Sequence, residues 1–397
     1  MMWRKVKLGD IAEFSNGINF DKGAYSKGVK LINVSNFGNR FSPEYDSLDE
    51  IKGEVVRNND LLSTGDIVFV RSNGNKELVG RCMLIDNPPE KVTYSGFCIR
   101  ARFKDTTDHD PVFWTYHFKN MAFRRAMSGT AIGANIQNLS QGRLAVYETM
   151  VPNIEGQKRI ANILSAYDNL IENNQKQIKL LEEAAQRLYK EWFVDLRFPG
   201  HEDVAIVDGV PEGWTRPSMN DIADYLNGYA FKPDDWNDKG KPIIKIKEMN
   251  EGITTSTPRN DGSTIPEKYN VAAGDILFSW SATLTAMIWD SEDGLLNQHL
   301  FKVTPNKGIC REYVLQSILK TLDEFKNLTT GSTMKHIQRG KLKEVFVNLP
   351  SQEIMDMFAS VAEVYREKIL KLQKQNNALK EARDRLLPKL MSGEIEV

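Results

Sequence analysis

The chain has few of the residues that build metal sites or disulfide frameworks. Among its 397 residues are three cysteines (Cys82, Cys98 and Cys310), which form no Cys-x-x-Cys pair. Its five histidines lie at no metal-ligand spacing from a cysteine or from one another. An odd, scattered set of cysteines indicates a reducing compartment, so we expect a cytoplasmic protein without a bound metal.

Long apolar runs and nucleotide-binding loops are also missing. No run approaches the roughly 20 apolar residues that cross a bilayer, and residues 1–7 lack the apolar stretch of a secretory signal. No Gly-Lys-Ser/Thr occurs, which excludes a Walker phosphate loop. Residues 87–90 (Asn-Pro-Pro-Glu) resemble the tetrad of adenine methyltransferases, but Glu90 has no ring to stack on a flipped base. We therefore expect no catalytic residue and no cofactor on this chain.

The chain lacks a charge bias as well. Its 52 Lys+Arg residues stand against 53 Asp+Glu, a formal net charge of −1. Nucleic-acid-binding proteins usually carry a basic excess. Charge alone therefore does not indicate DNA, and it leaves room only for a local basic surface or for partners that supply the rest of the positive field.

What the sequence does contain is a duplication. Residues 8–17 (LGDIAEFSNG) return as residues 219–228 (MNDIADYLNG), and residues 64–69 return as 273–278. The shift falls from 211 positions (8 to 219) to 198 (175 to 373), as expected of two copies that drifted by loop changes. Solenoid repeats span only about 20 to 50 residues. The pattern thus predicts two whole modules with an internal pseudo-two-fold axis, suited to a target that has two halves.

The first part of each copy has the pattern of an α+β domain. Short β-branched and aromatic runs occur at 29–34, 66–70 and 97–103, and again at 242–246, 275–278 and 299–303. Turn residues separate them, which is typical of a twisted mixed sheet. Helical stretches interrupt the strands around Val112–Met127 and Arg311–Asn327.

The second part of each copy is helical and follows Pro152 or Pro350. Apolar residues recur there at the heptad spacing of a coiled coil, with Pro388 expected to end the last helix. One row holds Ile160, Tyr167, Asn174, Leu181 and Leu188, beside rows of Ile163, Leu170, Gln177 and Ala184 and of Leu164, Ile171, Ile178, Ala185 and Trp192. The other copy repeats the phase with Phe358, Tyr365, Leu372, Leu379 and Leu386.

A helix over 160–192 spans about 50 Å at roughly 1.5 Å per residue, far more than a small domain needs. The two helices are either separate surface helices or, as we favour, antiparallel partners that form a rigid spacer. Polar Asn174 and Gln177 opposite Leu372 and Gln375 would fix their register. The residues expected at the helix interface, which also faces partners, are Ile160, Tyr167, Leu181, Leu188, Phe358, Tyr365, Leu379 and Leu386.

Polar loops follow matching strands of the two copies and are the candidates for DNA contact. They cover 71–76 and 279–283, with a second pair at 128–137 and 330–338 before the helices. Arg and Lys suit guanine edges, and Asn and Gln suit adenine. For any one of these residues an ordinary solvated loop is the favoured interpretation, but the four loops as a set favour recognition. The candidate residues are Arg71, Ser72, Asn73, Lys76, Arg81, Thr130, Asn135, Gln137, Trp280, Ser281, Thr283, Ser332, Thr333, Lys335 and His336.

Three short stretches carry a resemblance to a known family. They are residues 209–214 (GVPEGW), 188–195 (LYKEWFVD) and 386–394 (LLPKLMSGE). Together with the two modules, they make the chain similar to the specificity (S) subunit of type I restriction–modification systems over nearly its whole length.

The resemblance implies a division into domains. Residues 1–151 and 214–349 would be target recognition domains, each reading one half of a bipartite, asymmetric site in double-stranded DNA. Residues 152–198 and 350–397 would be spacer helices, the latter with a C-terminal tail, and 199–213 a linker. The chain would not be an enzyme. Two modification subunits would bind around the helices with S-adenosylmethionine, and restriction subunits would bring ATP-dependent cleavage. The near-neutral charge departs from expectation, and such partners would share the phosphate contacts.

Other interpretations stay open. The chain can serve a related methyltransferase-only or type IIB-like system. It can be an enzyme with an unfamiliar site, or a coiled-coil scaffold whose modules read no DNA.

Overall fold

The computed structural model describes residues 2–38, 40–72, 78–128, 138–281, 283–327 and 339–397. The chain divides into two compact units, described separately below. Unit 1 comprises Met1–Asn173 and Asn376–Val397, and unit 2 comprises Asn174–Gln375. Each unit holds one mixed domain and one half of each long helix, so both long helices run through both units.

Unit 1 contains two sheets. The first is antiparallel in the order β2 (Ala12–Asn16), β8 (Cys98–Phe103), β5 (Ile67–Val70) and β6 (Cys82–Leu84). The second has the order β4 (Asp49–Ile51), β3 (Tyr25–Ile32) and β7 (Val92–Tyr94), with β3 and β7 parallel. A separate pair, β1 (Trp3–Lys7) with β9 (Glu148–Pro152), closes the domain at its base. The helices are α1 (Leu8–Ile11), α2 (Pro111–Lys119), α3 (Met121–Ser128) and α4 (Gln141–Ala145).

Unit 2 repeats this topology. Its first sheet has the order β12 (Ala223–Asn227), β19 (Leu300–Pro305), β16 (Ile276–Ser279) and β17 (Thr285–Ile288). Its second has the order β14 (Arg259–Asn260), β13 (Lys241–Ile244), β18 (Gly294–Leu296) and β15 (Asn270–Val271), with β13 and β18 parallel. A bridge between Thr215 and Leu349 takes the place of the β1–β9 pair. The helices are α6 (Met219–Ile222), α7 (Ile246–Glu251) and α8 (Arg311–Asn327). The predicted α+β fold and its duplication are therefore confirmed.

The central strand β5 shows why the runs of β-branched and aromatic residues form buried strands. All four of its residues are fully buried, because both faces of the sheet are covered. Ile67 and Phe69 point to the core under α2, whereas Val68 and Val70 point to the second sheet. This alternation is the two-residue period of a strand.

One expected helix of unit 1 is two helices. Asn120 lies between α2 and α3 with ψ of 137°, an extended conformation. Its side-chain oxygen accepts a hydrogen bond from the backbone N–H of Ala122 at 3.2 Å. An Asn side chain that competes for backbone donors in this way favours a helix start, so the chain turns here instead of continuing.

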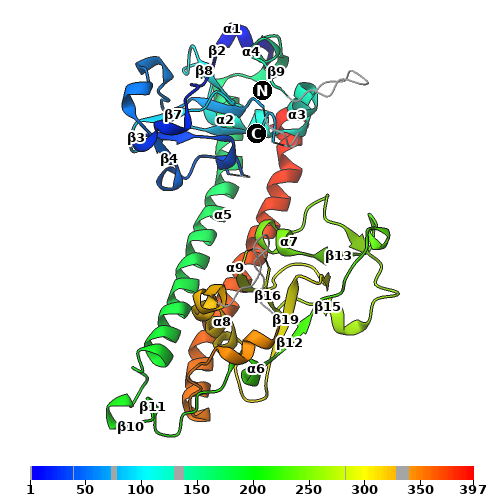
Figure 1. The fold of residues 1–397 in the computed structure, drawn as a ribbon. Coiled ribbons are helices and arrows are strands. Elements are labelled where there is room, and N and C mark those ends of the chain that lie inside the picture. The colour runs from blue at the N-terminus through cyan, green and yellow to red at the C-terminus, as the bar shows by residue number, and fades with distance from the viewer. Residues whose placement is uncertain (1, 39, 73–77, 129–137, 282, 328–338) are drawn as a thin grey trace. The chain divides into compact units, whose positions relative to one another are not determined.

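The long helices are α5 (Ile154–Tyr189), which continues into one π-helical turn (Lys190–Val194), and α9 (Gln352–Ser392). Figure 1 shows them side by side. In unit 1, Leu164 of α5 shares a core with Leu390 of α9, and in unit 2 Tyr189 of α5 shares a core with Phe358 of α9. The start of each helix thus meets the end of the other, which confirms the antiparallel pair.

The residues of the seam follow a 3–4 spacing. Ile160 and Phe358 are fully buried, and the other six predicted interface residues are half-buried. The row beginning at Ile163 lies at the margin, since its Leu170 is 51% exposed. The seam is therefore narrower than the three-row stripe that the sequence suggests.

Two predictions about the helices are wrong in detail. The polar residue buried on α9 is Asn376, not the exposed Gln375, while on α5 Asn174 is buried and Gln177 only half-buried. Asn376 falls in the heptad row of Ala362 and Ile369, so the rows hold but the polar partner lies in the neighbouring row. Pro388 does not end α9, which runs on to Ser392. So close to the helix end, loss of a single N–H donor still leaves one further turn intact.

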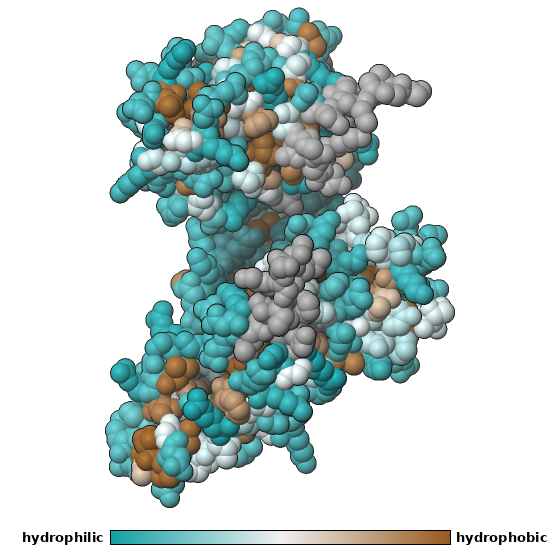
Figure 2. Space-filling view, viewed as in Figure 1, coloured by the Kyte–Doolittle hydropathy of each residue, from teal (hydrophilic) through white to brown (hydrophobic). Residues whose placement is uncertain are grey.

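A small hairpin lies in the segment between the two copies. It consists of β10 (Ile206–Val207) and β11 (Val210–Pro211), joined through Asp208 and Gly209, both with positive φ. Asp-Gly is the preferred pair for such a turn. Ile206 and Val207 are 58% and 50% exposed, and Figure 2 shows apolar surface over this hairpin at the lower end of the view. Over the described stretches of the chain, no helix is both long and apolar enough to span a membrane.

Candidate nucleic-acid interface

One edge of the first sheet carries the chain segments that sequence analysis selected in each unit. In unit 1, the chain leaves β2 and β5 and enters β8 at this edge. The link into β8 is a β-turn, residues 95–98, closed by a hydrogen bond from the Cys98 N–H to the Ser95 carbonyl at 2.8 Å. Unit 2 has the same turn at residues 297–300, closed between Leu300 and Asn297 at 3.0 Å.

Matching backbone hydrogen bonds hold the neighbouring segment against this turn. Gly17 donates to the Cys98 carbonyl at 3.1 Å, and Gly228 donates to the Leu300 carbonyl at 3.0 Å. A Cβ at Gly17 would lie 2.2 Å from the Ser95 carbonyl oxygen, and one at Gly228 would lie 2.1 Å from that of Asn297. Only glycine permits this approach, which explains why the sequence repeats Asn-Gly at both places.

The residue that follows the central strand also belongs to this frame. The backbone N–H of Arg71 donates to the Phe97 carbonyl at 2.7 Å, and its Nη1 donates to the Gly96 carbonyl at 3.2 Å. The counterpart in unit 2 is Trp280, whose Nε1 donates to Asn227 Oδ1 at 3.1 Å. Both predicted DNA contacts are half-buried and support the turn, while their different side chains give the two edges different chemistry.

The remaining described candidates differ in exposure. Thr283 is exposed and Ser281 is buried, with its carbonyl accepting a hydrogen bond from Ser279 Oγ. Ser72 forms a bridge with Asn138. Nine candidates lie outside the described residues, and their roles stay predictions: Asn73, Lys76, Thr130, Asn135, Gln137, Ser332, Thr333, Lys335 and His336.

A group of cations lies next to this edge in unit 1. Arg81 directly precedes β6, and its carbonyl accepts a hydrogen bond from the Val70 N–H at 2.9 Å. Arg124 of α3 donates to the Val79 carbonyl at 3.3 Å. Burial lowers the pKa of Arg124 and of Lys119, and the nearby charge of Arg81 lowers both pKa values further. Positive charge is thus concentrated here, although Lys119 also donates to the Arg40 carbonyl at 2.8 Å and is largely engaged within the domain.

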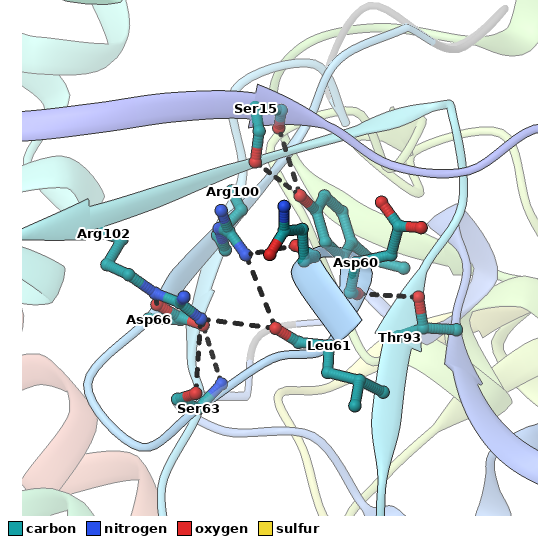
Figure 3. A network of polar contacts seen from close by, with 10 residues as sticks. Ser15, Asp60, Leu61, Ser63, Asp66, Thr93, Arg100 and Arg102 are labelled. Carbon is teal, nitrogen blue, oxygen red and sulfur yellow. Dashed lines mark hydrogen bonds and ion pairs between the residues drawn. The ribbon is translucent and has the colours of Figure 1, made fainter. Parts of the chain in front are cut away.

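A charged network below the edge in unit 1 has an internal role. Figure 3 shows Arg102 paired with the buried Asp66 (Nη2–Oδ2, 2.6 Å) and Arg100 donating to the Leu61 carbonyl at 3.4 Å. Lys302 of unit 2 repeats the second contact by donating to the Asn270 carbonyl at 2.7 Å. These cations fasten the segment before the central strand to the sheet. The arrangement is a structural tie, because each cation is engaged by a carboxylate or carbonyl of the same domain.

Each mixed domain is anchored to the helix pair through α2 or α8. In unit 1, Asp168 of α5 accepts a hydrogen bond from the Tyr116 hydroxyl of α2 at 2.5 Å and pairs with Arg383 of α9. In unit 2, the Tyr189 hydroxyl of α5 lies 2.9 Å from Ser317 Oγ of α8. The domains are thus joined to the helices by buried polar contacts as well as by apolar packing.

Sequence reasoning missed the turn itself. Phe97 is 59% exposed at the centre of the unit 1 turn, and Gln298 and His299 are half-exposed at the same places in unit 2. The signal was available, because aligning Phe97 with His299 also places Gly96 opposite Gln298. The sequence pattern places Phe97 and His299 in strands and assigns Gln298 no role, so none of them was predicted as a contact.

Comparison with known proteins identifies relatives over nearly the whole chain. The family model described as "Type I restriction modification DNA specificity domain" matches twice, at residues 2–183 and 211–381. The MjaIX specificity subunit of Methanocaldococcus jannaschii, a type I restriction enzyme subunit, is 26% identical over 71% of this chain and 68% of its own length. The HindI specificity subunit of Haemophilus influenzae is 24% identical over 99% of both chains.

A solved structure shares the fold. The S subunit of a type I restriction–modification system from M. genitalium matches 98% of this chain and 96% of its own, with a TM-score of 0.55 and 17% identity.

Proposed function

This chain belongs to the type I restriction modification DNA specificity family, and from this premise we propose that each of its two domains reads one half of a bipartite DNA site. The chain is a DNA sequence-specificity subunit. The observation that carries the proposal is the repeated edge, where one backbone frame holds different side chains in the two units. Two readers built alike but with different chemistry suit a site whose halves differ in sequence.

The helix pair would bind two modification subunits. The seam between α5 and α9 uses the inner faces, yet Leu170 and Leu180 of α5 and Val364 of α9 are 51%, 65% and 62% exposed. Apolar side chains left on the outer faces of helices favour binding of further helices or grooves. S-adenosylmethionine and ATP chemistry would belong to the modification and restriction subunits, which makes this chain the non-catalytic member of the complex.

The basic group around Arg81 would contact phosphate. Phosphate contacts position a protein on the duplex without reading sequence. The overall charge of −1 is then compatible with DNA binding, because the partner subunits would supply the other phosphate contacts.

The test is methylome sequencing of a host that carries the chain together with its modification subunits. We expect one bipartite motif, and a chimera with a foreign domain in place of residues 215–349 should change one half of that motif only. A change in both halves would overturn the assignment of one domain to each half-site. Assembly with the modification subunits but no sequence-specific methylation would favour a scaffold instead.

A further inference from the structure

The two turns at the recognition edge differ in where they carry a side-chain amide. The turn of unit 1 has Gly96 at its second position, where the turn of unit 2 has Gln298. In the segment packed against the turn the difference is reversed, because Asn19 of unit 1 corresponds to Ala230 of unit 2. Apart from the matching Asn16 and Asn227 and the buried Asn297, each unit therefore has one carboxamide beside the second turn position, supplied from a different segment.

The geometry of Gly96 shows that the Asn19 amide lies where a side chain at the Gln298 position of the turn would begin. A Cβ built on Gly96 would lie 2.1 Å from Asn19 Oδ1 and 3.1 Å from its Cγ. The Asn19 amide thus fills the volume into which a side chain at the Gln298 position begins. Unit 2 has the smaller Ala230 at the corresponding position, and its turn carries Gln298 instead of glycine.

Backbone contacts fix the segments that carry these amides. The Ile18 N–H donates to the Tyr94 carbonyl at 3.0 Å, and the Tyr229 N–H donates to the Leu296 carbonyl at 2.9 Å. Asn19 is exposed, and Gln298 is half-exposed with its Nε2 lying 3.5 Å from His299 Nε2. Both amides are therefore held at a rigid edge and open to solvent.

We propose that Asn19 in the first domain and Gln298 in the second are specificity-determining residues that each read an adenine. This inference rests on the proposed function and adds the residues and the base class. A carboxamide pairs with adenine through two hydrogen bonds: its oxygen accepts from adenine N6–H, and its nitrogen donates to adenine N7. Adenine alone offers this pattern in the major groove. Both domains present a carboxamide at the same edge although its position in the chain has changed, as a shared requirement for adenine would produce.

The experiment measures methylation of duplex libraries by the complex of this chain with its modification subunits. Gln298→Ala should relax one A·T position in the half-site of the second domain, with discrimination against other pairs falling by about 5- to 150-fold. Asn19→Ala should do the same in the other half-site. Each variant is the control for the other, because the opposite half-site should stay unchanged.

A rescue variant separates base reading from a structural role. Asn19→Ala/Gly96→Gln gives the first domain the arrangement of the second, and it should restore the adenine preference that Asn19→Ala loses. Gly96 has no positive φ, so glutamine is compatible with its backbone.

Three results would overturn the inference. They are unchanged discrimination in both single variants, relaxation at a G·C position, or failure of the double variant to restore adenine preference while it remains folded by circular dichroism. Failure of the proposed function looks different, since the unaltered complex would then methylate no specific sequence at all.

Discussion

Replacement of Phe358 by alanine tests the packing of the helix pair in unit 2. Phe358 is fully buried, and its ring centroid lies 4.9 Å from that of Phe193 and 6.0 Å from that of Trp192. Truncation of such a side chain costs about 3–5 kcal/mol, because the surrounding rings relax only partly into the cavity. In a unit of about 200 residues each kcal/mol shifts the melting temperature by about 2–4 °C, so we expect a fall of about 6–20 °C.

The assay is differential scanning calorimetry with urea denaturation of the same protein. Val364→Ala is the matched control, because Val364 lies on the same helix but is 62% exposed. Its substitution should change the free energy of unfolding by no more than about 0.5 kcal/mol. Equal stability of the two variants would refute the conclusion that Phe358 fixes the helix pair.

Three further predictions concern the helices and the two units. Leu181→Asp and Leu379→Asp each place a charge in the seam at a cost of several kcal/mol, so binding of the modification subunits should weaken; wild-type affinity of both in a pull-down titration would contradict the seam assignment. Four residues inserted after Gln177 add about 6 Å of helix, so the gap between half-sites should lengthen by nearly two base pairs; a methylome with an unchanged gap and full activity would show that the helices are not the spacer. Burial raises the pKa of Glu312 to about 7, against the opposing effect of Arg366. The folded state then holds a proton that the unfolded state has released, so unit 2 should lose stability as pH rises from about 4.5 to 7. Melting temperatures of Glu312→Gln measured across this range should lack that dependence on pH.

The duplication and the helix pair were readable because they depend on spacing alone. The repeat of Asn-Gly at residues 16–17 and 227–228 marks a place where a backbone approach excludes every side chain. The heptads predicted a seam because a buried row recurs at fixed intervals regardless of what it packs against. The width of the seam and the identity of its buried polar residue do not follow from spacing alone. Whether Asn376 or its neighbour Gln375 is buried depends on how α9 is rotated about its own axis.

The candidate DNA contacts were only partly readable. Loops after matching strands pointed to Arg71 and Trp280, yet Arg71 also donates to the turn and Trp280 donates to Asn227 in the segment beside the turn. The exchange of Asn19 for Gln298 leaves no signal in a single alignment column. Its two positions, 19 and 96 in the first domain, lie about 75 residues apart in the sequence and meet only in the fold. The spacing of residues in the sequence does not reveal which distant segments meet in the fold.

The pairing of the segments by which the chain enters and leaves each domain has a consequence for inheritance. Thr215 pairs with Leu349, as Arg4 pairs with Val151, so the chain enters and leaves a domain at adjacent points. A domain bounded in this way can be exchanged as one genetic segment, because a replacement needs to fit the rest of the protein only at two junctions that lie side by side in the fold. The remainder of the protein and its assembly surfaces stay as they were. If each domain reads one half-site as proposed, exchange between lineages would change one half-site at a time while the assembly surfaces stay unchanged.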